Sequence, residues 1–296
     1  MAHAIHFSPV IAGTMKWGSW GARFSTGDYL NMIEYCLDQQ VTTFDHADIY
    51  GHYTTEEEFG NALAKAPHLR ERMQLITKCG IRLVTPNRPS FRIRSYDTSK
   101  EYILQAAERS LQNLKTDRIE LLLIHRPDPL MDPDEIAEAF HQLQQDGKVL
   151  HFGVSNFNPS QASLIRDRFP IVNNQMEISI LHLDPFTNGS LHHCMQHHIL
   201  PTAWGPLGSG KLFDEELADE RTQRIRAVAT ILGEKYSLTT DQILLAWLTT
   251  HPSGIIPVLG TSRKERILAA KNAVSVHLDR EEWFMLWRAS TGEEVP

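Results

Sequence analysis

The sequence has little cysteine, no excess of basic residues and no long hydrophobic run. Its three cysteines, Cys36, Cys79 and Cys194, are an odd number without C-x-x-C spacing, so they predict neither a disulfide framework nor a zinc site. The formal net charge of −7 argues against general binding to nucleic acid or to an anionic membrane. Apolar runs such as LLLI at 121–124 are far too short to span a bilayer. Because MAHAIHFSPVIAG also lacks the pattern of a signal peptide, we expect a cytoplasmic protein with reduced thiols.

Two nucleotide-binding motifs are also missing. No G-x-G-x-x-G follows the first expected strand, as it would in a Rossmann domain. GPLGSGKL at 205–212 matches G-x-x-x-x-G-K, but Leu212 stands where a P-loop has the Ser or Thr that contacts magnesium. Hydrolysis of a nucleoside triphosphate is therefore not expected. The backbone N–H groups of this segment can still contact a phosphate, and the alternative is a flexible surface loop.

Short apolar runs alternate with segments of helical periodicity along the whole chain. We expect strands at 10–15, 42–45, 74–78, 119–125, 151–155, 171–177, 201–204 and 255–259. We expect helices near 28–40, 55–65, 99–114, 133–146, 159–168, 190–198, 222–234, 240–250, 263–273 and 280–288. This pattern predicts an α/β fold with one domain over 1–296: a single (β/α)8 TIM barrel with an extra C-terminal helix. Long loops are expected after strand 3 (80–97) and strand 7 (205–221), and a doubly wound sheet is the alternative fold.

Polar residues end most of the expected strands, where a barrel of this type carries its catalytic groups. They are Asp45, Lys78, His125, Ser155, Asn156, Gln175, Glu177, Trp204, Gly260, Thr261 and Ser262. A single residue of this kind is more often a hydrogen-bonded side chain at the rim, or a member of an ion pair, than a functional group. Because all of them should converge on one rim, their common position favours a functional site.

The residue types in this set permit proton transfer to an oxygen. A tyrosine has a pKa of about 10, and a nearby ammonium lowers that value by stabilising the phenolate. We therefore expect Lys78 to lower the pKa of Tyr50, with Asp45 holding Lys78 and His125 orienting a substrate oxygen. Such a set suits the protonation of an alkoxide as a carbonyl is reduced. No nucleophile is paired with a base, which disfavours acyl transfer.

The motifs, in their order, resemble those of the aldo-keto reductase superfamily. They are F-D-H-A-D-I-Y-G, T-K-C-G, L-L-L-I-H-R-P-D, G-V-S-N-F, N-Q-M-E and L-G-T-S, and the likeness extends from Gly13 to about Asn272. The resemblance implies NADPH-dependent reduction of aldehydes or ketones to alcohols. It implies a catalytic tetrad with Tyr50 as the general acid: Asp45, Tyr50, Lys78 and His125.

The resemblance also implies a site for NADPH or NADP+. The nicotinamide would be held by Ser155, Asn156 and Gln175 and would stack on Trp204. Further expected contacts come from Gly13, Thr14, Met15, Asp45, Gly205, Pro206, Leu207, Gly208, Ser209, Gly210, Lys211, Gly260 and Thr261. Ser262, Arg263 and Arg266 precede or begin a helix, a suitable place for a 2′-phosphate. Ala269 and Ala270 replace an acid and an asparagine of the family pattern, so the adenine contacts should differ.

A small-molecule carbonyl compound is the expected substrate, in a pocket that includes Met15, Trp17, Trp20, His46, Tyr53, Arg126 and Phe157. The loop after strand 3 carries Arg82, Arg88, Arg92 and Arg94, which suit either an anionic substrate or a solvated loop. We expect a monomer without nucleic-acid or membrane partners.

Two other functions stay open at the level of sequence. One is an NADPH-binding sensor or regulatory protein of the same fold with little turnover. The other is a metal-dependent hydrolase using Asp45, His46, Asp48 and His125, which the lack of H-x-H on the first strand disfavours. Histidines of HHCMQHH at 192–198 have a spacing that suits chelation on a helix, but no further ligands accompany them, so we expect no metal site.

Overall fold

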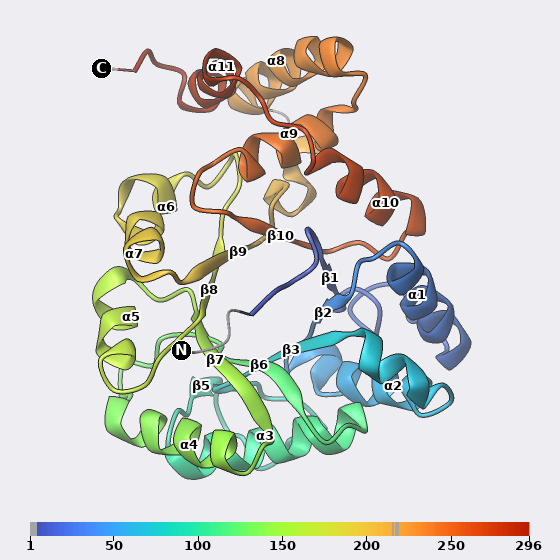
Figure 1. Ribbon diagram of the computed structural model, residues 1–296, viewed down its shortest axis with the longest axis vertical. Helices are drawn as coiled ribbons and strands as arrows, with labels where there is room; N and C mark the ends of the chain where they lie inside the picture. Colours follow the sequence, from blue (N-terminus) through green and yellow to red (C-terminus); the bar gives the residue numbers. More distant parts are fainter. Residues whose placement is uncertain (1–4, 215, 217–218, 296) are drawn as a thin grey trace.

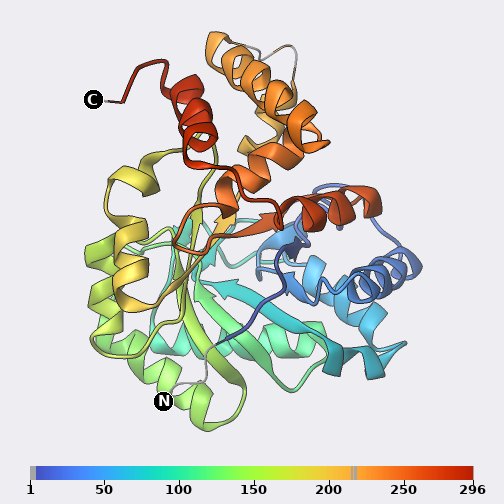
Figure 2. The same ribbon diagram turned by 45° about the horizontal axis from the view of Figure 1, so that its top comes forward.

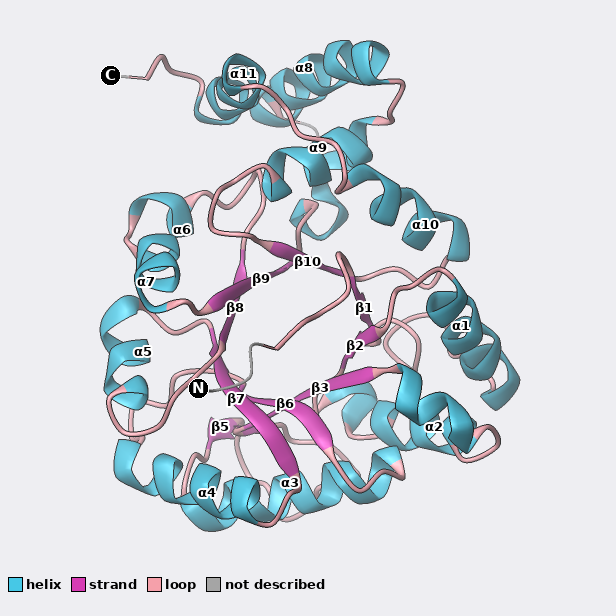
Figure 3. Ribbon diagram, viewed as in Figure 1, coloured by secondary structure: helices cyan, strands magenta, loops and turns pink. Residues whose placement is uncertain are grey.

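Eight parallel strands close into a barrel in the computed structural model, which describes residues 5–214, 216 and 219–295. Their order around the barrel is β1-β10-β9-β8-β7-β6-β3-β2, and a ring of helices surrounds them (Figures 1 and 3). The prediction of a (β/α)8 barrel is confirmed and the doubly wound alternative was wrong. Parts of three predicted segments lie outside the described residues: 1–4 of the N-terminal stretch, 215, 217 and 218 of the second long loop, and 296 of the domain.

The strands are short and buried. Their bounds are β1 (Ile11–Gly13), β2 (Thr43–Asp45), β3 (Gln74–Cys79), β6 (Ile119–Ile124), β7 (Val149–Ser155), β8 (Asn173–Glu177), β9 (Leu200–Trp204) and β10 (Ile256–Leu259). Side chains alternate between the interior of the barrel and the helical layer. Ile76, Leu121 and Leu123 pack together inside, whereas Leu122 and Ile124 belong to the core beneath the helices. Lys78 follows Ile76 by two residues, so the same alternation turns it inward.

The helices cover the strands with their apolar faces. The main ring comprises α1 (Thr26–Asp38), α2 (Thr55–Leu63), α3 (Lys100–Leu114), α4 (Pro133–Gln145), α5 (Pro159–Arg166), α7 (Ser190–His197), α9 (Thr240–Thr249) and α10 (Lys264–Ala273). A short α6 (Asp184–Thr187) precedes α7. The extra C-terminal helix α11 (Arg280–Thr291) packs against α8 (Glu220–Tyr236) beyond this ring (Figures 1 and 2). None of the described helices is both long and apolar enough to cross a membrane.

The two long loops contain structure that the sequence did not predict. After β3, β4 (Ile81–Arg82) pairs antiparallel with β5 (Ser95–Tyr96). After β9, the chain forms the 3-10 segment η3 (Gly208–Phe213) before it reaches α8. Two further 3-10 segments are η1 (Tyr50–His52), just after β2, and η2 (Pro67–Arg72), just before β3. The two long loops leave the C-terminal ends of β3 and β9.

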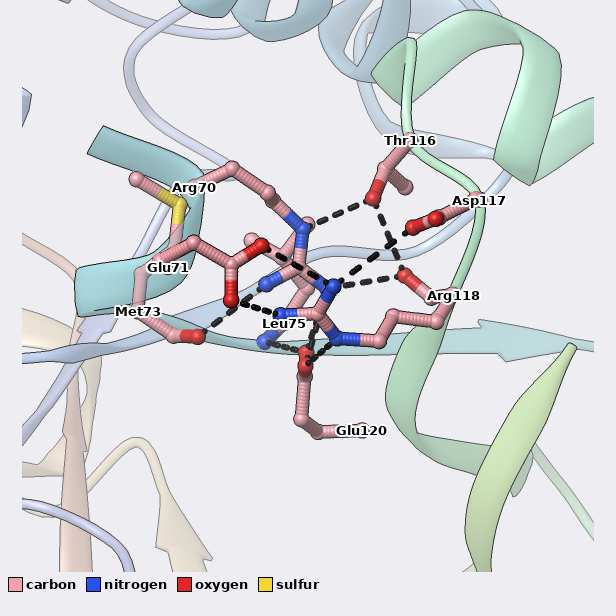
Figure 4. A network of polar contacts seen from close by, with 8 residues as sticks. All are labelled: Arg70, Glu71, Met73, Leu75, Thr116, Asp117, Arg118 and Glu120. Atoms are coloured by element: carbon pink, nitrogen blue, oxygen red, sulfur yellow. Dashed lines mark hydrogen bonds and ion pairs between the residues drawn. The ribbon is translucent and has the colours of Figure 1, made fainter. Parts of the chain in front are cut away.

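A polar network joins η2, β3 and β6 at the N-terminal end of the barrel (Figure 4). The carboxylate of Glu120 accepts hydrogen bonds from Arg70 at 2.9 Å and from the backbone N–H of Leu75 at 2.8 Å. Arg118 also contacts Glu120 and pairs with the exposed Glu71. Because Arg70 and Glu120 are both buried, the pair depends on these further hydrogen bonds to offset desolvation. This network ties β3 to β6 at the end opposite Lys78.

Candidate active site

The central contact at the C-terminal end of the barrel joins Lys78 to Asp45. Asp45 ends β2 and pairs in register with Gly13 of β1 and Ile76 of β3. The Nζ of Lys78 lies 2.8 Å from each carboxylate oxygen of Asp45, and the side chains are only 1% and 3% exposed. The same ammonium donates to the backbone oxygen of His46 at 2.8 Å and to the Tyr50 hydroxyl at 3.1 Å. Every N–H of the ammonium therefore has an acceptor.

A tight turn after β2 brings Tyr50 to Lys78. Tyr50 begins η1, and Gly51, His52 and Tyr53 all have positive φ, so the chain reverses there within a few residues. The Tyr50 ring is half-buried. Its hydroxyl oxygen accepts from Lys78, which leaves the hydroxyl hydrogen available to a ligand. Tyr50 can therefore donate a hydrogen bond to a ligand while it accepts one from Lys78.

The charges of Tyr50 and Lys78 depend on burial and on each other. Burial raises the pKa of Tyr50; the positive charge of Lys78 acts to lower it, as expected, but does not reverse the rise. For Lys78, burial acts to lower the pKa, but the Asp45 carboxylate and Tyr50 outweigh it and raise the pKa overall. At neutral pH, the phenol therefore keeps its proton and the ammonium keeps its charge.

His125 follows β6 and is the fourth polar group of this cluster. Its ring centroid lies 6.2 Å from that of Tyr50, with the planes nearly perpendicular. Burial lowers its pKa well below the ordinary histidine value, and the positive charges of Lys78, Arg126 and Arg94 add to the effect. Its Nδ1 is buried without a partner among the described residues. A neutral imidazole with an unused ring nitrogen is suited to hydrogen bonding with a ligand.

A hydrogen-bonded chain connects the tetrad to the neighbouring strands β7, β8 and β9. Gln175 donates from Nε2 to Asp45 Oδ1 at 2.9 Å, and its backbone oxygen accepts from Ser155 Oγ at 2.9 Å. Asn156 donates to Ser155 at 2.7 Å, and the indole N–H of Trp204 donates to Asn156 at 2.9 Å. The structure thus brings together four of the residues expected at a nicotinamide. The contact of Gln175 with Asp45 was missed, because only barrel closure shows it.

The glycine-rich segment after Trp204 has an unusual backbone. Gly205, Gly208, Ser209 and Gly210 all have φ between 56° and 93°. The buried Leu212 anchors the segment in the hydrophobic core, a role that a P-loop Ser or Thr would not fill. Ser209, Gly210 and Lys211 are exposed beyond this anchor.

The turn between β10 and α10 lies beside β1. A Cβ on Gly13 would meet the Leu259 oxygen at 2.7 Å, so glycine lets β1 and β10 approach. Space is open beside Gly260, and Trp17 donates to the Thr261 oxygen at 3.0 Å. Arg263 precedes α10 without a capping side-chain bond, so N–H groups at this terminus stay available to an anion. Arg263 and Arg266 are both exposed.

The Aldo/keto reductase family model matches residues 9–289 of this chain. The protein belongs to the aldo/keto reductase family. It is 47% identical over 298 residues to the uncharacterized oxidoreductase YcsN of Bacillus subtilis (strain 168), a match that covers 100% of this chain and 98% of that protein. It is 39% identical over 297 residues to the 6-dehydroglucose reductase of Agrobacterium fabrum (strain C58), with 100% and 98% covered.

A solved structure shares the fold of this aldo/keto reductase. The structure of a glycerol dehydrogenase from Gluconobacter oxydans superposes with a TM-score of 0.84 at 24% identity, covering 100% of this chain and 97% of that one. The family resemblance expected from the motifs is confirmed, and the chain is an oxidoreductase by its relatives.

The expected pocket residues of this aldo/keto reductase fall into two groups. Trp20 lies beside Tyr50, with ring centroids 6.1 Å apart, and the Arg126 guanidinium lies over the Trp204 ring at 5.5 Å. The partly exposed Met15 follows β1, and Tyr53, beneath Arg88, is almost wholly buried. Trp17, His46 and Phe157, by contrast, are enclosed by other residues. Trp17 and Phe157 belong to the hydrophobic core, so the structure does not bring them to the tetrad.

His46 connects β2 to Thr14. The Thr14 hydroxyl donates its only hydrogen to the Asp45 backbone oxygen at 2.9 Å, so His46 Nδ1, 3.0 Å away, must donate to Thr14. This assigns a neutral Nδ1–H tautomer, and burial together with Lys78 lowers the pKa of His46 to about 3. The Nε2 is left buried without a partner among the described residues. His46 therefore holds the backbone that accepts from Lys78.

Among the described residues there is no group of three or more His, Cys, Asp or Glu side chains placed to hold a metal ion. Asp48 is buried, and its pKa is raised, first by burial and then by the negative charge of Glu56. In the histidine-rich α7, His193 contacts Ser163 at 2.9 Å and stacks edge-on against His197. The burial of Asp48 and the contacts of His193 favour structural roles for these residues.

Proposed function

We propose that this aldo/keto reductase reduces aldehyde or ketone carbonyls to alcohols with NADPH, with Tyr50 as the general acid. The observation that carries the proposal is the ammonium of Lys78, shared between the Asp45 carboxylate and the Tyr50 hydroxyl. The relatives named as oxidoreductases support it.

The residues of the tetrad divide the work of proton transfer. NADPH, when bound, supplies the hydride that reaches the carbonyl carbon. The carbonyl oxygen gains negative charge as this happens and takes the proton of Tyr50. The resulting phenolate lies 3.1 Å from the Lys78 ammonium, which stabilises it in a buried setting. Neutral His125 hydrogen-bonds the carbonyl oxygen and orients it towards Tyr50.

The residues present fit a nicotinamide cofactor. The Trp204 ring offers a stacking face, held by its bond to Asn156, while Ser155, Asn156 and Gln175 offer polar groups for the carboxamide. Phosphate contacts would come from residues 205–211 and from the uncapped start of α10. There Ser262, Arg263 and Arg266 would hold the 2′-phosphate that distinguishes NADPH from NADH. Gly13, Thr14, Met15, Pro206, Gly260 and Thr261 would line the rest of this site.

The proposed substrate pocket is smaller than the sequence suggested. We include Met15, Trp20 and Arg126, which are partly exposed or lie against tetrad or cofactor residues, and Tyr53 at its edge. Trp17 and Phe157 are left out because they are packed in the core, and His46 acts through the backbone. We propose one domain over the whole chain, acting as a cytoplasmic monomer.

The test is NADPH oxidation with a panel of aldehydes and ketones, including 6-dehydroglucose, the compound in the name of the Agrobacterium relative. We expect Tyr50→Phe to lower kcat by about 10²- to 10⁴-fold while NADPH binding persists. Tyr96→Phe, at an exposed tyrosine of β5, should match the wild type. Undiminished activity in Tyr50→Phe contradicts the mechanism. NADPH binding without turnover on any carbonyl indicates a sensor instead, and metal-dependent activity without NADPH indicates a hydrolase.

A further inference from the structure

Arg126 lies at the C-terminal rim of the barrel, next in sequence to His125. Its guanidinium carbon is 5.5 Å from the centroid of the Trp204 ring, so the side chain extends from the end of β6 towards the end of β9. The side chain is only partly exposed. It therefore presents a partly desolvated positive charge beside the residues proposed to hold the nicotinamide.

This guanidinium has no carboxylate partner among the described residues. Other partly shielded arginines do: Arg70 pairs with Glu120, Arg118 with Glu71, and Arg168 with Asp134. The chain as a whole carries an excess of acidic groups, so partners for a cation are abundant. A partly buried cation without a counter-charge costs free energy, and an anionic ligand removes that cost.

A second arginine, Arg94, adds a weaker positive charge that also acts on His125. Arg94 lies in the loop that leaves β4 and returns at β5, and its charge acts on His125 together with that of Arg126. The charge of Arg126 also reaches Tyr50. Arg126 therefore acts on both residues proposed to handle the carbonyl oxygen, His125 and Tyr50. A substrate group that neutralises Arg126 would therefore occupy the same pocket as the reacting carbonyl.

Cofactor phosphates are a less suitable partner for this charge. The backbone features that suit phosphates follow β9 and β10: the segment 205–210, in which Gly205, Gly208, Ser209 and Gly210 have positive φ, and the uncapped start of α10. Arg126 follows β6, which is separated from β9 in the barrel by β7 and β8. The guanidinium lies over the ring of Trp204, and its charge acts on His125 and Tyr50, beside which a substrate would bind.

We propose that Arg126 selects carbonyl substrates that carry an anionic oxygen group, a carboxylate or a phosphate, close to the aldehyde or ketone. This inference rests on the proposed carbonyl reductase activity and names the substrate class of that same site. The planar guanidinium can donate two parallel hydrogen bonds to either group. Arg94 strengthens the local field and Arg126 makes the contact.

The test compares matched pairs of substrates in wild type and Arg126→Gln. One pair is para-carboxybenzaldehyde and its neutral methyl ester; the other is glyceraldehyde phosphate and glyceraldehyde. We expect Arg126→Gln to lower kcat/KM for the charged member by about tenfold to a hundredfold and to change that for the neutral member less than about threefold. The pair with the larger loss identifies carboxylate or phosphate. Arg280→Gln, at an exposed arginine of α11, removes the same net charge and should keep the wild-type ratio.

Two further measurements separate the competing explanations. If Arg126→Gln weakens NADPH binding and lowers both members of each pair equally, Arg126 serves the cofactor and the inference is wrong. Equal use of charged and neutral substrates by the wild type also contradicts it. If no carbonyl is reduced at all, calorimetric titration with para-hydroxymethylbenzoate tests whether Arg126 binds an anion. Binding that Arg126→Gln weakens at least about tenfold supports the anion site without the reductase activity, and unchanged or absent binding overturns it.

Discussion

Lys78 and Asp45 form an ion pair that is closed to solvent, with the ammonium 2.8 Å from both carboxylate oxygens. Each partner has a further contact, since Gln175 donates to Asp45 and the His46 oxygen accepts from Lys78. The pair joins β2 to β3 inside the barrel and at the same time sets the charge beside Tyr50. Stability and the proposed proton transfer therefore depend on the same two side chains.

The coupling within this pair can be measured directly. Asp45→Asn or Lys78→Met alone leaves one buried charge without its partner, and we expect each to destabilise the fold by about 3–5 kcal/mol. The double variant should recover part of that loss, because no uncompensated charge remains. Urea unfolding of the four proteins gives the coupling free energy. Strictly additive losses would show that the two charges do not interact.

The pKa directions predict the pH dependence of the reaction. The pKa of Tyr50 lies above its ordinary value of 10.0, so the proton donor persists throughout the neutral and mildly alkaline range. The pKa of His125 lies well below 6.5, so the imidazole is already neutral at pH 6.5. We expect kcat/KM for carbonyl reduction to stay flat between these values, and the reverse oxidation, which needs the phenolate, to rise with pH. A reduction rate that falls with a midpoint near roughly pH 8 contradicts this assignment.

His46 predicts a loss of stability in acid. Its pKa of about 3 in the folded protein is below the 6.5 of an exposed histidine, so the unfolded chain binds the proton first as pH falls. Stability from this residue is present above pH 6.5 and declines below it, by roughly 2 kcal/mol at about pH 5. Urea unfolding at both pH values measures the decline. His46→Asn keeps a donor to Thr14 but does not titrate, so it should show a correspondingly weaker dependence on pH. An identical dependence in both proteins counts against the assignment.

The N-terminal network predicts a stability effect without a catalytic one. Glu120→Gln leaves the buried Arg70 guanidinium without its counter-charge, and we expect a loss of about 3 kcal/mol or more. Glu71→Gln is a matched control in the same network, at a side chain that is 73% exposed, and should cost less than about 1 kcal/mol. Thermal unfolding compares the two. Both variants should keep the wild-type kcat well below their Tm, and a large change in kcat would mean that the two ends of the barrel are coupled.

Much of the fold followed from local sequence patterns, and the errors have local causes. Periodicity located the eight barrel strands, because most of them are apolar runs bounded by polar residues. The largely polar β8 was found through the apolar residues that precede it at 171 and 172. The first helix begins at Thr26 and not near residue 28, because Ser25 and Asp28 form a capping box, which makes Asp28 the third helical residue. The hairpin of β4 and β5 was missed, because strands of two residues are too short to show a period.

The site was predictable as a set of residues but not as a set of contacts. Asp45, Lys78 and His125 each end an apolar run or follow one, so a barrel places them on the same rim. The bond from Gln175 to Asp45 joins strands that are not neighbours in sequence, and no local pattern encodes it. The net rise in the pKa of Tyr50 did not follow from the sequence, which gives the neighbouring charge but not the extent of burial.

Strand β3 takes part in the N-terminal polar network and in the ion pair of the candidate active site within a span of four residues, Leu75 to Lys78. The backbone of Leu75 is fixed by Glu120 at one end, and the ammonium of Lys78 is held by Asp45 near the other. The residues drawn around Leu75 and Glu120 come from η2 through β3, from β6 and from the turn before β6, and none of them belongs to the described parts of the loops 80–97 and 205–221 at the other end of the barrel. This separation is useful for protein engineering. Loops at the C-terminal end of the barrel can be exchanged while the network at the N-terminal end keeps the strand register on which the positions of the tetrad residues depend.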